Sequence, residues 1–69
     1  MPLCFADINV ELIIKEIKGN DKIKKRLSEL GFIVGEKVSV VNKVNDNVII
    51  KIKGVTLAIS EELARRVMI

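Results

Sequence analysis

The residue types that most often carry catalysis are scarce in this chain. It contains no histidine and a single cysteine, Cys4. A nucleophilic serine, threonine or cysteine needs a general base within hydrogen-bond reach, and the absence of histidine removes the usual one. The adjacent carboxylates Glu61 and Glu62 follow Ser60, a residue type that commonly caps the start of a helix. In the first turn of a helix, acidic side chains interact favourably with the helix dipole. We therefore expect a protein that is not an enzyme and has no catalytic residues.

Metal and phosphate sites are equally hard to build from this sequence. The candidate ligands are scattered without a recurring spacing: Cys4, Asp7, Glu11, Asp46, Glu61 and Glu62. Zinc sites need clustered Cys or His, and calcium loops need regularly spaced acids. The glycines at positions 19, 31, 35 and 54 form neither phosphate-binding pattern, so we interpret them as turn residues. We expect no metal site and no cofactor. Cys4 is expected to act as a small apolar residue near a mobile end, with a redox role as the alternative.

Four cations in one stretch have the clearest potential for recognition: Lys22, Lys24, Lys25 and Arg26. They are expected in the first turns of a helix, where the helix dipole disfavours positive charge by about 0.3–1 kcal/mol each. One interpretation is a solvated helix face in which Lys25 pairs with Glu29, four residues on. The other is a surface that attracts an acidic partner. The stem of Arg26 is expected to pack on the barrel, while its guanidinium reaches a partner or a strand-end carbonyl.

Length and composition limit the class of protein. The chain has 69 residues, which we expect to form a single domain over residues 1–69, and 49% of them are hydrophobic. Its 12 basic and 9 acidic residues give a net charge of +3, which is low for a dedicated nucleic-acid binder of this size. No apolar run reaches the roughly 18 residues that cross a membrane, and a secretion signal is not evident, so we expect a cytoplasmic protein.

One helix and the turn that ends it must position the four cations. Asn20 or Asp21 can cap the start of this helix. Three apolar residues recur along one of its faces, Ile23, Leu27 and Leu30. Gly31 can adopt the left-handed conformation that ends a helix, which places Phe32 to pack back on Leu27 as in a Schellman motif.

The remainder of the sequence predicts strands joined by tight turns. Strand-like segments span residues 11–18, 37–44, 48–53, 55–59 and 67–69. Turn residues at Asn45-Asp46-Asn47 and Lys53-Gly54 predict two hairpins, and Ser60 can cap a short helical turn. Three faces are expected to point inward: Val38, Val40 and Val44; Val48, Ile50 and Ile52; and Val55, Leu57 and Ile59. Both phenylalanines, Phe5 and Phe32, are expected to be core or staple residues. The fold predicted is mainly β, a small and partly open SH3-like barrel of about five strands.

Two patterns carry a resemblance to a known family. They are K-x-R-L-x-x-L-G-F-x-x-G-x-x-V over residues 24–38 and K-G-x-x-x-A-I over residues 53–59. With the order of elements, they make the chain similar to the ferrous iron transport protein A family, FeoA. Family members commonly carry Pro-Gly where this chain has Ile8-Asn9 and Val34-Gly35. Asparagine can adopt the same left-handed turn, so the fold assignment is unaffected.

The resemblance implies a non-enzymatic accessory protein of ferrous iron uptake. Its partner would be a FeoB-type membrane transporter with a cytosolic G-protein domain, so the chain would be recruited to the inner face of the membrane. The residues expected to contact that partner are Lys22, Lys24, Lys25, Arg26, Gly31, Phe32 and Gly35. Arg26 acting directly on the GTPase site is an alternative role for that residue.

Two other functions stay open. A small barrel with positive charge can bind nucleic acid, although two phenylalanines offer no platform for stacking bases. A partly open barrel can also pair its edge strands and form a homo-oligomeric scaffold.

Overall fold

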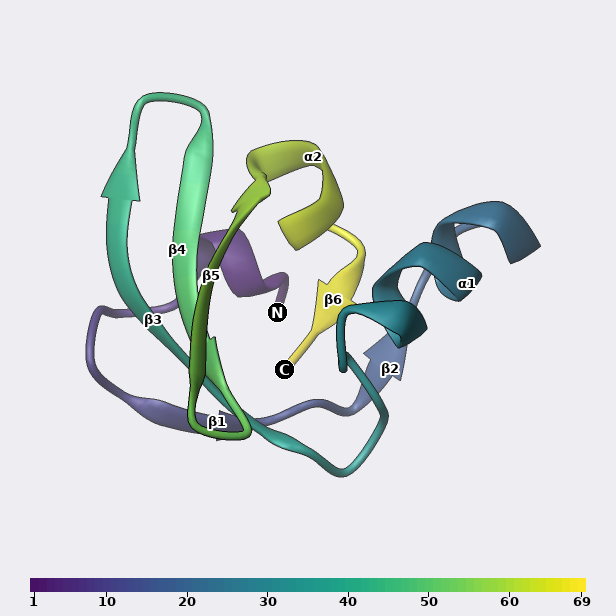
Figure 1. The fold of residues 1–69 in the computed structure, drawn as a ribbon, viewed down its shortest axis with the longest axis horizontal. Helices are drawn as coiled ribbons and strands as arrows, with labels where there is room; N and C mark the ends of the chain where they lie inside the picture. Colours follow the sequence, from purple (N-terminus) through teal and green to yellow (C-terminus); the bar gives the residue numbers. More distant parts are fainter.

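Two β-sheets enclose the core of the molecule (Figure 1). The computed structural model describes Met1–Ile69. The larger sheet is antiparallel, in the order β1-β3-β4-β5, and the smaller pairs β2 with β6. The strands are β1 (Glu11–Ile13), β2 (Glu16–Ile17), β3 (Lys37–Val44), β4 (Asn47–Ile52), β5 (Val55–Ser60) and β6 (Val67–Met68). The helices are the 3-10 helix η1 (Leu3–Phe5), α1 (Asp21–Glu29) and α2 (Glu61–Ala64). The predicted mainly β architecture is confirmed, with six strands instead of five.

The core consists entirely of hydrophobic residues. Fifteen of the 69 residues are buried, and none of them is polar or charged. The inward faces of β3 and β4 contribute five of these residues, Val38, Val40, Val48, Ile50 and Ile52. Period-two alternation therefore predicted most of the buried surface of this hairpin correctly.

Both predicted hairpin turns are confirmed. Val44 pairs with Asn47 across a two-residue turn in which Asn45 has a φ of 54°. Ile52 pairs with Val55 across Lys53 and Gly54, whose φ values are 52° and 77°. The second turn has a positive φ at both central residues, which is the type I′ geometry, whereas the first has one at Asn45 alone, as in type II′. Both types suit the twist of paired strands.

The expected first strand, residues 11–18, divides into β1 and β2 because its partner changes. Glu11 to Ile13 pair with β3, whereas Glu16 and Ile17 pair with β6 in the other sheet. Between them, the N–H of Ile14 donates to the carbonyl of Glu36 at 3.0 Å, and Ile14 is buried. The chain thus turns the corner of the barrel at a residue that carries no local turn signal.

The expectation that Val44 shares the buried face of Val38 and Val40 is wrong. The register of β3 against β4 shifts between Val40 and Asn42, a β-bulge that inverts the alternation beyond it. Val44 is consequently 46% exposed. On β5, Ile59 is buried, but the inward-facing Val55 is 55% exposed, because this strand lies at the edge of the sheet.

The N-terminal segment differs from expectation in two respects. Phe5 is 64% exposed and does not belong to the core, because η1 turns Leu3 and Cys4 inward and directs Phe5 outward. Cys4 is buried and packs as a small apolar residue, but the end that carries it is not loose. Pro2 forms a β-bridge with Met68, and the N–H of Ile69 donates to the carbonyl of Met1 at 2.8 Å.

Candidate interaction surface

Helix α1 begins and ends at the residues that the sequence predicts. The side chain of Asn20 accepts a hydrogen bond from the backbone N–H of Ile23 at 2.9 Å, which caps the first turn. Leu27 is the one fully buried residue of the helix, and Ile23 and Leu30 are partly buried beside it. The narrow apolar stripe therefore holds α1 against the barrel and leaves the remaining faces in solvent (Figure 1).

The Schellman motif at the end of α1 is confirmed. The N–H of Phe32 donates to the carbonyl of Leu27 at 2.9 Å, and the N–H of Gly31 donates to the carbonyl of Ser28 at 3.0 Å. Gly31 has a φ of 98°, which an L-residue adopts only with strain. Phe32 and Leu27 are both buried in the core, so the helix is anchored at the point where the chain reverses.

A second turn follows directly, and it presents exposed apolar side chains. The N–H of Glu36 donates to the carbonyl of Ile33 at 3.0 Å, and Gly35 has a φ of 95°. A positive φ at the third position alone defines a type II turn with Val34 at its apex. Ile33 is 46% and Val34 is 59% exposed, and we call residues 33–35 the exposed turn.

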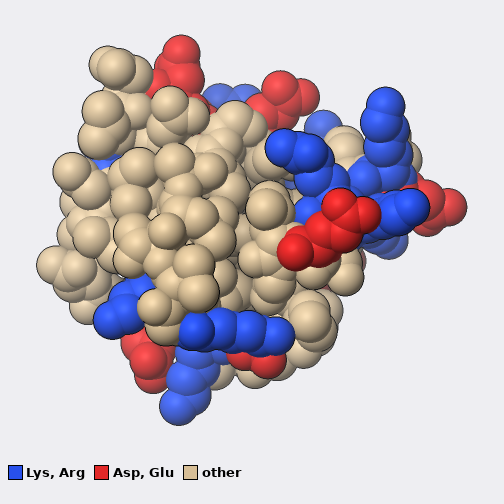
Figure 2. Space-filling model, viewed as in Figure 1, with Lys and Arg blue, Asp and Glu red and all other residues tan.

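The four cations of α1 are all exposed, and we call them the basic surface: Lys22, Lys24, Lys25 and Arg26. None of them takes part in an ion pair or a side-chain hydrogen bond. Figure 2 shows lysine and arginine side chains gathered over α1, where it projects from the barrel. The basic surface is thus positive charge that is not used within the molecule.

The expected pair between Lys25 and Glu29 does not form. Exposed pairs of this spacing contribute little, and a lysine that precedes its glutamate has the weaker orientation along a helix. Arg26 likewise makes no hydrogen bond to a strand-end carbonyl, and its side chain lies in solvent.

The other residues predicted to contact a partner divide by burial. Gly35 is exposed at the turn, and Gly31 is half-buried. Phe32 is only 1% exposed, so its contribution is to hold the turn and it offers no surface to a partner. Sequence reasoning did not single out Ile33 and Val34, although two turn glycines that bracket apolar residues are a signal that those residues are held outward.

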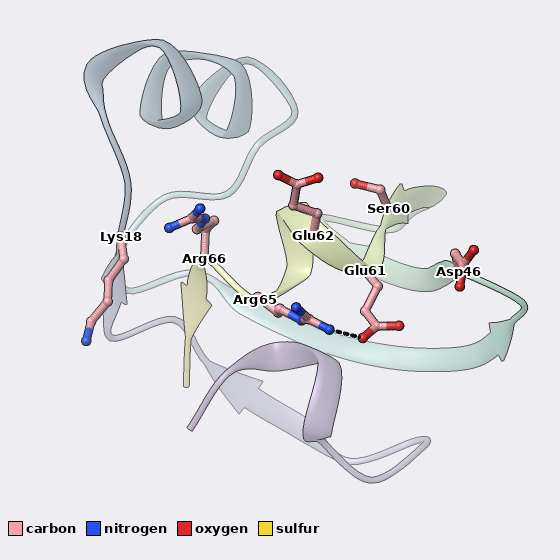
Figure 3. A pocket seen from close by; sticks show the side chains of 7 residues that line it. All are labelled: Lys18, Asp46, Ser60, Glu61, Glu62, Arg65 and Arg66. Atoms are coloured by element: carbon pink, nitrogen blue, oxygen red, sulfur yellow. Dashed lines mark hydrogen bonds and ion pairs between the residues drawn. The ribbon is translucent and has the colours of Figure 1, made fainter.

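A polar groove lies beside α2 (Figure 3). Its seven lining residues include no hydrophobic side chain: Lys18, Asp46, Ser60, Glu61, Glu62, Arg65 and Arg66. The groove is held locally, since the hydroxyl of Ser60 accepts from the N–H of Leu63 at 3.2 Å, as predicted for the cap of α2.

The charged side chains of this groove either pair with each other or point in different directions. Arg65 donates to a carboxylate oxygen of Glu61 at 2.8 Å, and this hydrogen bond raises the pKa of Arg65 above its ordinary value. Figure 3 shows Lys18 and Glu62 pointing in different directions, so the side chains do not converge on one point. No three His, Cys, Asp or Glu side chains come close enough together to hold a metal ion.

The bent four-stranded sheet, the small second sheet and the inserted helix define a small β-barrel of the SH3-like class. FeoA of Stenotrophomonas maltophilia, solved with zinc and described as a procaryotic SH3 domain protein, has this arrangement. It superimposes with a TM-score of 0.84 and 27% identity over 99% of this chain and 87% of that one. A crystal structure of the iron uptake regulatory protein FeoA gives a TM-score of 0.91 and 29% identity, over 99% of this chain and 92% of that one.

The chain belongs to the FeoA family. The family model for the FeoA domain matches residues 1–69. A Methanocaldococcus jannaschii protein provisionally named Fe(2+) transport protein A is 37% identical over 68 residues, which are 99% of this chain and 83% of that relative. The predicted SH3-like fold and the predicted family are both confirmed, and the family is one of ferrous iron transport. The helices are too short to cross a membrane, since even α1 has only nine residues.

Proposed function

We propose that this chain is a non-enzymatic accessory protein of ferrous iron uptake that binds the cytosolic part of a FeoB-type membrane transporter. In this proposal the chain acts in the cytoplasm and is recruited to the inner face of the membrane by protein contact. The observation that carries the proposal is the basic surface, four exposed cations without partners on α1 of a FeoA-family domain.

The position of this charge supports a role in binding. Lys22 lies in the first turn of α1, where the helix dipole disfavours a cation. A charge that weakens its own helix, and that no residue of the chain neutralises, is explained by an acidic surface on a partner. Such charges accelerate association and set its orientation more than they add affinity.

The exposed turn supplies an apolar contact of defined shape. Ile33 and Val34 are held by the type II turn, by the anchor of Phe32, and by the N–H of Gly35, which donates to the carbonyl of Ile14 at 2.8 Å. A rigid apolar contact loses little conformational entropy on binding. We therefore propose the basic surface for steering and the exposed turn for contact, with an acidic and partly apolar partner.

The proposal is tested by substituting the four residues of the basic surface with alanine. The variant should lose capture of the detergent-solubilised transporter and should fail to restore ferrous iron uptake in cells that lack the chain. Unchanged capture together with unchanged uptake would show that the basic surface does not bind the transporter. Circular dichroism should show an intact fold, because all four side chains are exposed.

Measuring GTP hydrolysis distinguishes direct action of Arg26 on the GTPase site from a role of Arg26 in binding alone. If Arg26 acted on the GTPase site, Arg26→Lys would abolish any stimulation of hydrolysis by the chain while binding persisted, since lysine keeps the charge but not the planar guanidinium. We expect Arg26→Lys to behave like the unmodified chain in both assays.

A further inference from the structure

Strand β5 leaves a long edge of the larger sheet open. It is the last strand in the order β1-β3-β4-β5, and β6 belongs to the other sheet. Proteins usually protect such edges with charged residues, proline, bulges or very short strands. The opposite edge, β1, has three residues and carries Glu11. By contrast, β5 has six residues, VTLAIS, and its register against β4 continues without a shift.

The register identifies the backbone groups that remain free. Ile52 and Val55 close a two-residue hairpin, so Val55, Leu57 and Ile59 exchange hydrogen bonds with β4. The residues between them, Thr56 and Ala58, direct their N–H and C=O groups away from the sheet. Both residues are exposed, and neither takes part in the backbone hydrogen bonds formed outside the strands and helices.

Charge is absent along this edge. Charged residues make up 30% of the chain, yet β5 contains none. Figure 2 shows a broad uncharged surface over the centre of the face on which β5 lies nearest the viewer in Figure 1. A charge close to a two-fold axis lies near its own copy and is repelled by it, so an edge suited to self-pairing should be uncharged near that axis.

We propose that β5 pairs antiparallel with β5 of a second copy of this chain, about a two-fold axis at Leu57. In this register Thr56 stands opposite Ala58 of the second copy, so the outward N–H and C=O groups of both residues are satisfied. Val55 stands opposite Ile59 of the second copy, and the two Leu57 side chains meet. The pairing thus covers Val55, which is 55% exposed although it faces inward.

A second copy suits this edge better than an acidic or basic peptide, because no charged side chain of β5 could select one. One strand pair buries less than a standard interface, so the association is weak, with a Kd on the order of 0.1 mM. It is independent of the proposed function, because the basic surface lies on α1 and the paired edge on β5.

The experiment is sedimentation of the full chain from about 10 µM to about 1 mM, concentrations that bracket the expected Kd. The weight-average mass should rise from 7.7 kDa towards twice that value, and amide exchange at Thr56 and Ala58 should slow as concentration increases. High salt should not weaken the dimer, in contrast to binding through the basic surface.

Thr56→Lys should weaken the dimer at least about tenfold, because the two lysines would be diagonal neighbours across the axis and would repel each other. Val44→Lys is the matched control, since it adds the same charge at an exposed residue of β3 and should not alter the Kd. In a Cys4→Ala background, Leu57→Cys should form an intermolecular disulfide and Val44→Cys should not.

Three results would overturn the proposal. The first is a folded chain that stays monomeric to about 1 mM, ten times the expected Kd. The second is a dimer that Thr56→Lys leaves unchanged, which would place the interface elsewhere. The third is a weight-average mass that keeps rising beyond that of a dimer, which would indicate open-ended aggregation through the edge.

Discussion

Val34 occupies the position of the exposed turn at which type II turns favour proline. Its φ is not positive, whereas that of Gly35 is 95°, and its N–H takes no part in the turn and loop hydrogen bonds. Val34→Pro should therefore raise the free energy of unfolding by about 0.4–1 kcal/mol, by restricting the unfolded chain. Urea denaturation of Val34→Pro and of the control Val34→Ala tests this. An equal gain in both would show that loss of the exposed valine, and not rigidity, is the cause.

Gly31 gives a second prediction for a single residue. A Cβ atom at Gly31 would meet nothing within 4 Å, so the cost of Gly31→Ala is backbone strain at a φ of 98° and not a clash. We expect a loss of about 1–2 kcal/mol of stability. Gly31→Asn should lose less, since asparagine tolerates the left-handed conformation better. Thermal unfolding of the two variants would contradict the Schellman account if alanine were the better tolerated residue.

Individual residues were predictable where the physics is local. Asn20, Gly31 and Gly54 act through their own backbone or through neighbours within four residues, and sequence patterns capture such effects. Phe5 was misjudged because hydrophobicity alone placed it in the core. Its direction depends on how η1 seats Leu3 and Cys4 in a core built from residues far away in the sequence.

In helix α1, the charge that is proposed to bind the transporter also lowers the stability of the helix. Lys22→Glu should raise the free energy of unfolding by about 0.3–1 kcal/mol, because it replaces a cation with an acid in the first turn. The same change should weaken binding of the transporter, because it reverses a charge of the basic surface. Chemical denaturation and binding would be measured on the same variant. Lys43→Glu, an exposed lysine on β3, should change neither quantity appreciably.

The strands show which structural features could be predicted from the sequence and which could not. The hairpins around Asn45 and Gly54 were predictable from turn residues and alternation. The division of residues 11–18 was not, because Ile14 turns the corner only in response to partners in two different sheets. The bulge at Val40 and Asn42 had no local signal either, and it reversed the exposure of Val44.

On the scale of the whole molecule, the two proposed surfaces differ in chemistry. The basic surface on α1 would bind through charge, and the open edge of β5 would bind through backbone hydrogen bonds. The sequence predicted the basic surface by its composition, whereas the free edge at Thr56 and Ala58 emerged only from the strand order. A change in ionic strength should therefore separate the two, weakening the first and sparing the second.

Binding of a transporter through the basic surface is tested by the affinity of the full chain for the detergent-solubilised FeoB-type transporter of the same organism. In the test variant, glutamine replaces the four residues of the basic surface: Lys22, Lys24, Lys25 and Arg26. The control removes the same charge from four exposed lysines of the β3–β4 hairpin and the turn after it: Lys37, Lys43, Lys51 and Lys53.

We expect the Kd of the test variant to be at least about tenfold higher than that of the unmodified chain, and the Kd of the control to change less than about twofold. Added salt should weaken binding of the unmodified chain more than binding of the test variant. Equal weakening by the two variants would show that only net charge matters. Binding of the test variant with unchanged affinity would contradict the assignment of the basic surface.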